Sequence, residues 1–469
     1  MRYTPLRVME SVNAAFLRIS RAEIKGILSR KERLSLRHGM GMFTDRGKPR
    51  TIDVQLRPWA VDARQLRFFH RTCLLLRASL SRVLPLYLNQ QQVRRVVPLP
   101  PQEHAWVMEI NAGGLQRPQA VVDRLDATAT FAVTDWKNFW FLEPNSVGIG
   151  GVYYIPATCE LIERWILPTL RRYLPALPMS PPDDIRQLLL KLFSRHARAI
   201  GRPLRCVALV EDRSSVGGTD EFGLLARYFI RQGLQAVVAD PREISVHRGD
   251  LTVKRKKIDL IYRDSELEEI LQMGRRSGPR SIAGIKEAFL RNRVISSIAG
   301  EFDHKSVWEL FTSPEFARHF TFRQRRLFRD HLLWTRLLWE RRTTDFRGRP
   351  VDLPVFARRN REVLTLKPNR EYGGEGVLFG HNLTQKAWES HLERALRRPG
   401  TYVVQQRALV KAELFPVARP DGSIKLEPYY AVTGFAATQD GLAVLGRSSK
   451  EAVVNVSRKG GLISIWRLG

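Results

Sequence analysis

A lysine followed closely by three glycines is the stretch of this sequence with the clearest chemistry. Residues 364–380 read LTLKPNREYGGEGVLFG, in which Lys367 ends a short apolar run that predicts a strand. Gly373, Gly374 and Gly376 let backbone N–H groups approach phosphate oxygens and allow positive φ angles. The order differs from a P-loop, because the lysine precedes the glycines. We predict a phosphate-binding loop; the alternative is a tight hairpin with an exposed lysine.

A second group of polar residues lies on a predicted β-hairpin. Two β-rich runs, DRLDATATFAV and FWFLEPN, flank the polar turn TDWKN. Pairing about this turn places Asp126 opposite Glu143 and Arg124 opposite Asn145, and Asn145 shares a face with Glu143. Carboxylate and amide oxygens are hard ligands that suit Mg²⁺. We predict that Asp126, Glu143 and Asn145 bind Mg²⁺; the alternative is a pair of exposed carboxylates at strand ends.

Other segments of the chain must hold these groups in place. Cys206–Val210 and Ala236–Ala239 read as strands on either side of a helix, which predicts an α/β unit with a parallel sheet. Residues 1–100 read as mostly helical, and Phe322–Glu340 reads as an Arg-rich amphipathic helix. TYVVQQ, residues 401–406, reads as a strand that follows the glycine loop.

The charge is strongly basic, with a formal net charge of +30 from 77 Lys and Arg against 47 Asp and Glu. Residues 1–100 hold 20 basic and 6 acidic side chains, and residues 323–349 hold 9 and 3. Such a balance favours an anionic partner such as nucleic acid, a membrane surface or a phosphorylated ligand. The alternative, a solvated basic surface without a specific partner, is the interpretation that we prefer for most of these charges.

The cysteines and the hydropathy pattern bear on the compartment. Three cysteines without a CxxC pair predict neither a disulfide framework nor a thiolate metal site, so we expect a reducing, cytoplasmic setting. No apolar run approaches the roughly 20 residues that a membrane-spanning helix needs. The first residues lack a long apolar stretch before a cleavage site, so no signal peptide is expected.

Four features in a fixed order resemble a known family. They are an R-x-D…E-x-N hairpin (Arg124, Asp126, Glu143, Asn145), a strand–helix–strand unit (Arg205–Asp240), a His-Lys pair (His304, Lys305) and a K-P-x-x-x-x-G-G-x-G loop (Lys367–Gly376). From about residue 105 to its end, the chain resembles the circularly permuted ATP-grasp ligases, the group that includes the glutathionylspermidine synthase-like proteins.

The resemblance implies an α/β (α+β) fold, a circularly permuted ATP-grasp fold with a pre-ATP-grasp α/β subdomain and a helical N-terminal region. The expected parts are a basic, mostly helical region (1–104), a metal-binding hairpin part of the ATP-grasp domain (105–182), the pre-ATP-grasp α/β subdomain (183–300) and a nucleotide-binding part (301–469).

The resemblance also implies an activity, ATP-dependent ligation of a carboxylate to an amine or thiol through an acyl phosphate, with ATP and Mg²⁺. Small-molecule or peptide carboxylates and amines would be the partners. The implied roles are Mg²⁺ ligation (Asp126, Glu143, Asn145), phosphate neutralisation (Lys305, Lys367), a mobile lid (Gly373, Gly374, Gly376), the adenine hinge (Gln405, Gln406), stabilisation of the transferring phosphoryl group (Arg124) and substrate or phosphate contact (Arg447, Asn455).

A rival hypothesis is a binding protein. In that case the ATP-grasp fold persists, ligase activity is weak or lost, and the basic surface docks non-specifically on an anionic partner.

Overall fold

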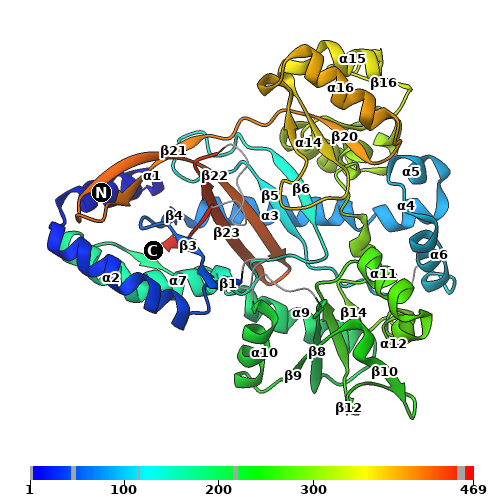
Figure 1. Ribbon diagram of the computed structural model, residues 1–469, viewed down its shortest axis with the longest axis horizontal. Coiled ribbons are helices and arrows are strands. Elements are labelled where there is room, and N and C mark those ends of the chain that lie inside the picture. The colour runs from blue at the N-terminus through cyan, green and yellow to red at the C-terminus, as the bar shows by residue number, and fades with distance from the viewer. Residues whose placement is uncertain (1–3, 44–48, 115–116, 215–219, 452–459) are drawn as a thin grey trace.

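A seven-stranded sheet lies at the centre of the computed structural model, which describes residues 4–43, 49–114, 117–214, 220–451 and 460–469 (Figure 1). Its strands run in the order β3-β24-β23-β22-β5-β6, and β21 pairs with β22. Their bounds are β3 (Asp53–Val54), β24 (Gly461–Ile463), β23 (Gly441–Ser449), β22 (Ile424–Thr438), β5 (Arg124–Ala127), β6 (Phe141–Asn145) and β21 (Ala412–Ala418). The hairpin with the predicted metal ligands is therefore one edge of this sheet.

The two faces of the central sheet serve different purposes. On one face, Phe435 of β22 stacks on Phe69 of α3 (Ala63–Leu80), with ring centroids 4.8 Å apart. On the other face, Gly434 has no side chain, and a Cβ there would lie 2.9 Å from atoms of Arg124 and Asp126. Successive residues of a strand point to opposite faces. One face of the sheet therefore packs on α3, and the other carries polar side chains such as Arg124 and Asp126.

The N-terminal region is helical as predicted, but it also supplies strands to sheets formed by the end of the chain. Strands β3 and β4 pair in parallel with β24 and β25, which come from the last ten residues. Figure 1 shows the two termini on the same side of the molecule. The elements are α1 (Pro5–Arg18), α2 (Arg21–Arg37), β1 (Gly41–Phe43), β2 (Pro49–Thr51), β4 (Trp59–Val61), α3 (Ala63–Leu80), α4 (Val83–Asn89), α5 (Gln91–Val96), α6 (Pro101–Ile110) and β25 (Ile465–Leu468).

The predicted parallel α/β unit is present. Its sheet has the order β14-β13-β8-β9, and every pair in it is parallel. Strands β8, β13 and β14 are buried throughout, as expected for a sheet with helices on its faces, and the edge strand β9 is partly exposed. The elements are α9 (Ile185–Ala199), β8 (Cys206–Val210), α10 (Glu221–Arg231), β9 (Gln235–Ala239), β13 (Leu260–Arg263), α11 (Leu267–Ser277), α12 (Ala283–Leu290) and β14 (Val294–Ile295).

The glycine loop belongs to a smaller antiparallel sheet with the order β15-β20-β18-β19. Helices α15 and α16 cover one face of it and form a separate core around the fully buried Trp388. The elements are β15 (Thr335–Leu337), α15 (Leu353–Arg359), β18 (Leu364–Pro368), β19 (Leu378–Phe379), α16 (Gln385–Leu396) and β20 (Tyr402–Gln406).

One predicted helix is shorter than the periodicity indicated. The Arg-rich helix expected over Phe322–Glu340 is α14 (Phe322–His331), and β15 follows it. Residues 332–338 are buried on both sides. A continuous apolar run is compatible with a helix or a strand. Here Thr335–Leu337 form a strand because they pair with β20, some 70 residues later.

The remaining elements are small connecting units: α7 (Tyr154–Trp165), α8 (Leu167–Tyr173), β7 (Met179–Ser180), η1 (Pro241–Glu243), β10 (Ile244–His247), β11 (Asp250–Val253), β12 (Lys256–Lys257), η2 (Pro279–Ile282), η3 (Ile298–Phe302), α13 (Val307–Thr312), η4 (Pro314–His319), β16 (Arg342–Thr344), β17 (Pro350–Asp352), η5 (Arg361–Val363) and η6 (Gly380–Asn382). Among the described residues, no helix is long and apolar enough to cross a membrane.

Candidate active site

A cavity of about 740 Å³ brings together residues of the central sheet, the glycine-loop sheet and the parallel unit. Nine of the predicted site residues line it: Arg124, Asp126, Glu143, Asn145, Lys367, Gly373, Gly374, Gln405 and Arg447. Lys305, Gly376 and Gln406 are described but stand outside this lining, and Asn455 lies outside the described residues. Segments separated by more than 300 positions in the sequence thus meet at one place.

The hairpin has the register that the sequence predicted. Asp126 pairs with Glu143, and Arg124 pairs with Asn145. Arg124 bonds the Asp126 carboxylate at 2.9 and 3.2 Å, and Arg447 on β23 reaches it at 2.8 Å. Burial raises the pKa of the Asp126 carboxyl, but the two arginines outweigh it and hold the pKa below its usual value. Asp126 is therefore an ionised group with cations on two sides.

Two lysines face this hairpin from different segments. Lys305 Nζ lies 3.4 Å from the Glu143 carboxylate and donates a hydrogen bond to the Glu371 carbonyl. Burial lowers the pKa of Lys367 to about 8; Glu143 and Asp126 oppose this shift, and Lys305 adds to it. A cation that is poorly solvated and lies close to a second cation favours a bound anion, since the anion would relieve the repulsion.

The alternation of β18 and β20 decides which side chains reach the cavity. Thr365 pairs with Gln405, and both line the cavity, as does Lys367 two residues further on. Leu366 and Val404 point to the other side, into the core around Trp388. Gln405 donates from Nε2 to Thr335 Oγ1 at 2.9 Å and to the Leu142 carbonyl at 3.3 Å.

Gln406, next to Gln405, therefore points away from the cavity, because successive residues of a strand face opposite sides. Its pairing with Leu364 places it on the face of the second core. The sequence analysis assigned both glutamines to the adenine hinge, but the alternation of β20 directs only Gln405 into the cavity.

The three glycines of the loop all need backbone conformations that suit glycine. Gly373, Gly374 and Gly376 have φ angles of 71°, 73° and 66°, in the left-handed region that β-branched residues strongly disfavour. The start of the loop, in contrast, is fastened to the rest of the protein. Arg370 bonds both carboxylate oxygens of the buried Glu103 at 2.8 Å. The conformational freedom expected of this lid is therefore concentrated in its glycines.

The predicted ligands suit Mg²⁺ that also binds a nucleotide. Asp126, Glu143 and Asn145 offer two carboxylates and one amide, and the Asn145 amide nitrogen donates to the Arg124 carbonyl at 3.2 Å. This leaves the amide oxygen available to a cation. The described part of the chain contains no group of three or more His, Cys, Asp or Glu arranged to hold a metal. Such a sparse set fits Mg²⁺, which is usually bound through one or two carboxylates together with substrate phosphates.

An acidic wall of the cavity was not predicted from the sequence. Its members are Glu221, Asp264, Glu266 and Glu269. They follow the carboxyl ends of β8 and β13, the edge where parallel sheets usually bind ligands. Their position after these strands is the feature of the sequence that could have indicated them. Burial, together with nearby carboxylates, raises the pKa of Glu266 to about 9 and that of Glu221 to about 7.

This wall predicts a pH-dependent stability in the ligand-free protein. The folded-state pKa of Glu266 lies above its value in the unfolded chain, so its contribution to stability falls as pH rises from about 4.5 towards 9. Glu266→Gln should therefore raise the melting temperature by roughly 1–3 °C at pH 9 and by less than about 1 °C at pH 6. Calorimetry at the two pH values measures the difference, and an equal change at both would contradict the assignment.

Comparison with solved structures identifies the fold. A glutathione synthetase-like effector from Globodera pallida matches with a TM-score of 0.61 and 11% sequence identity, over 99% of this chain and 98% of that chain. A putative gamma-glutamylcysteine synthetase from Methylobacillus flagellatus gives 0.39 at 12% identity, over 83% and 87%; D-alanyl-alanine synthetase A from Vibrio cholerae gives 0.26 at 9%, over 54% and 88%. These two scores are too low to support an argument.

No protein-family model and no curated protein sequence matches the chain. The first structural match extends over nearly the whole length of both chains, and at this identity it shows the fold alone. The resemblance to an ATP-grasp group is therefore confirmed as a fold, with the architecture of a glutathione synthetase-like protein.

Proposed function

We propose that this chain, which has a glutathione synthetase-like fold, is an ATP-dependent ligase that joins a carboxylate to an amine. One observation carries the proposal. The oxygen ligands of the hairpin, Lys367 and two glycines of the loop, Gly373 and Gly374, line one cavity, and Lys305 Nζ lies 3.4 Å from the Glu143 carboxylate. Phosphoryl transfer requires this combination of cations, hard oxygen ligands and a loop that can close.

The proposed reaction has two steps, with ATP as a substrate. A substrate carboxylate oxygen attacks the γ-phosphorus, the bond to the β-phosphate bridging oxygen breaks, and ADP leaves. The amine nitrogen of the second substrate then attacks the acyl carbon, phosphate leaves, and the nitrogen loses a proton. Lys305, Lys367 and Arg124 would neutralise the negative charge that builds up on the phosphoryl oxygens.

Asp126, Glu143 and Asn145 would hold Mg²⁺, which would supply positive charge to offset the negative charge of the phosphates. Arg447 would contact a phosphate or the substrate carboxylate from β23. Gly373, Gly374 and Gly376 would close over the phosphates and exclude water, which protects a labile acyl phosphate.

The acidic wall supports an amine rather than a thiol as the acceptor. Asp264, Glu266 and Glu269 line the cavity, and a cationic amine substrate would stabilise their ionised forms. A neutral thiol would not.

We further propose that the ATP-grasp fold is circularly permuted, with the parts divided near residues 104, 182 and 300. The order along the chain supports this, because the ligand hairpin precedes both lysines. A reducing, cytoplasmic setting fits the three free cysteines, which are all buried.

An ADP-release screen tests the proposed function. Purified protein with Mg-ATP is assayed against pairs of carboxylates and amines, among them amino acids, peptides and polyamines. A ligase should release ADP only when both substrates are present, and mass spectrometry should show the joined product. Release of ADP with a carboxylate alone would indicate hydrolysis of the acyl phosphate, and release with an alcohol acceptor would favour a kinase.

A second candidate function is docking on nucleic acid through a basic face. Helices α3 and α14 carry exposed arginines (Arg64, Arg67, Arg71, Arg323, Arg326, Arg329). The two helices pack side by side, since Gln324 donates to Ser79 Oγ at 2.9 Å and the rings of Phe68 and His331 lie 6.2 Å apart. Two basic segments that are about 250 positions apart thus lie side by side, and α3 packs on one face of the central sheet through Phe69. We infer that their exposed arginines form one basic surface.

This surface predicts a separable loss of function. The triple variant R64E/R67E/R71E should weaken binding to a labelled duplex DNA at least about tenfold at 100 mM salt and should reduce the salt slope by about 3. ADP release should not change. The matched control, K25E/R30E/R33E on α2, alters the net charge equally. Equal losses in both variants would show a general charge effect, and stronger binding to anionic lipid vesicles than to DNA would favour a membrane.

A further inference from the structure

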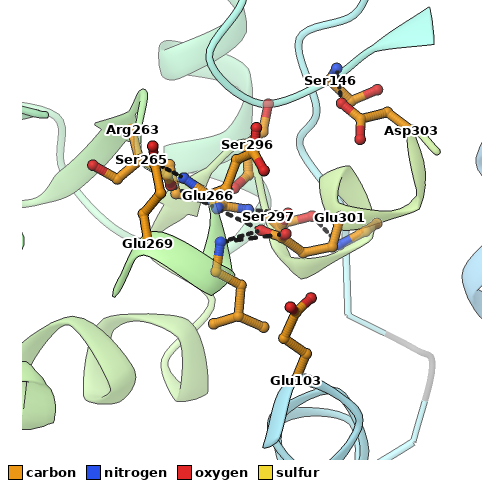
Figure 2. A network of polar contacts seen from close by, with 12 residues as sticks. Glu103, Ser146, Arg263, Ser265, Glu266, Glu269, Ser296, Ser297, Glu301 and Asp303 are labelled. Carbon is orange, nitrogen blue, oxygen red and sulfur yellow. Dashed lines mark hydrogen bonds and ion pairs between the residues drawn. The ribbon is translucent and has the colours of Figure 1, made fainter. Parts of the chain in front are cut away.

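A buried carboxylate lies where three parts of the proposed site meet, and the reaction above gives it no role. Asp303 is 5% exposed and accepts a hydrogen bond from the Ser146 backbone N–H at 2.7 Å (Figure 2). It also accepts a hydrogen bond from the Tyr372 hydroxyl at 3.1 Å. Ser146 follows the predicted ligand Asn145, and Tyr372 precedes the glycines. One carboxylate therefore connects the ligand hairpin to the glycine loop.

The segment around Asp303 is joined to the start of the loop at further points. The Lys305 N–H donates to the Asn369 carbonyl at 3.0 Å, and the Ser306 N–H donates to Asn369 Oδ1 at 2.9 Å. Lys305 Nζ donates to the Glu371 carbonyl and lies 5.5 Å from the centre of the Tyr372 ring. The lysine that contacts Glu143 is therefore bound to the loop that follows Lys367.

The base of this connection is rigid. Glu301, in the turn of η3 just before Asp303, forms a buried ion pair with Arg263 at 2.6 Å. Figure 2 shows Arg263 at the centre of a network in which it also bonds the carbonyls of Ser296 and Ser297, at 2.8 and 3.2 Å. Because Arg263 and Glu301 are paired with each other and hydrogen-bonded to the backbone, η3 holds Asp303 in a fixed position.

We propose that Tyr372 and Asp303 form a latch that holds the glycine loop against the ligand hairpin. Both are positioning residues, and what the loop covers rests on the proposed function. A loop with three glycines has many conformations to lose on closing. A hydroxyl-to-carboxylate bond is among the stronger hydrogen bonds, and it fixes the loop beside Lys305 and Asn145 before a nucleotide binds.

Tyr372→Phe tests the latch because it removes one hydroxyl and keeps the ring. In the ligand-free protein, hydrogen exchange of residues 370–376 should accelerate by about fivefold to tenfold, and the Kd for ADP should rise by a similar factor. Tyr173→Phe is the matched control, since the Tyr173 hydroxyl also donates to a carboxylate, that of Glu23 at 2.8 Å, on a helix far from the loop in sequence. Neither quantity should change in the control.

A double-mutant cycle separates the latch from a general loss of stability. If Tyr372 and Asp303 act through their shared bond, Y372F/D303N should exchange no faster in the loop than the more affected single variant, whereas independent effects would add. Additive effects, or unchanged exchange in Tyr372→Phe, would overturn the proposal. The exchange measurement needs no nucleotide, so it stands even if the ADP-release screen finds no ligase activity.

Discussion

Asp126→Asn should lower ATP-dependent ADP release by at least about a hundredfold, because the proposed metal ligand and a fixed negative charge are lost together. The amide keeps the shape of the carboxylate and one of its oxygens. The Mg²⁺ concentration for half-maximal rate should rise as well, and it should rise in Glu143→Gln, on the facing strand. A magnesium titration of the wild type and both variants measures the shift.

The structure supplies a competing explanation that the experiment must separate. Asp126 also accepts from Arg124 and Arg447, so its loss leaves two buried cations without a partner, which typically costs about 3–5 kcal/mol. Asp123→Asn is the matched control, since Asp123 is a buried carboxylate paired with Arg77 at 2.7 Å and is not part of the cavity lining. Similar destabilisation of both variants, with an unchanged magnesium requirement in Asp126→Asn, would show that Asp126 is a counter-ion alone.

The features that the sequence predicted well depend on local pairing. The hairpin register follows from symmetric pairing about one turn, and the structure has that register. The parallel unit follows from strand, helix and strand in succession. The glycines at 373, 374 and 376 indicated positive φ because few other residues tolerate it, and all three have it.

The features that the sequence left open depend on contacts between distant segments. Residues 332–338 could have continued a helix, and β20 makes part of them a strand. The acidic wall forms where the ends of separate strands meet, so its members look unrelated along the chain. Gln405 and Gln406 differ through strand alternation, which the exact bounds of β20 determine.

The glycine loop gives the second large expected effect. Lys367→Ala should weaken nucleotide binding at least about tenfold, because a phosphate in a poorly solvated cavity loses a charge-assisted hydrogen bond. Lys367→Arg keeps the charge and should retain most of the affinity. Lys305 lies close enough to lower the pKa of Lys367, so its charge would remain and residual binding is expected. A nucleotide titration of the three proteins should show that the affinity falls in the order wild type, Lys367→Arg, Lys367→Ala.

Gly374→Val should act on loop closure instead of on phosphate contact. Gly374 has a φ angle of 73°, and a β-branched residue in that region costs about 1–3 kcal/mol. We therefore expect turnover to fall more than nucleotide affinity. Gly348→Val is the matched control, since Gly348 has a φ angle of 77° in the turn between β16 and β17, where a Cβ would meet no atom within 4 Å.

Limited proteolysis with and without ATP completes the test of this loop. ATP should protect residues 370–376 of the wild type from cleavage, and the protection should be weaker in Gly374→Val and in Lys367→Ala. The dependence on nucleotide concentration should distinguish the two variants. A high concentration of nucleotide should restore protection in Lys367→Ala, whereas the strain at residue 374 in Gly374→Val persists at any concentration. Unchanged affinity in Lys367→Ala, together with cleavage that ATP does not suppress in the wild type, would leave a simple hairpin with a part-exposed lysine as the better explanation.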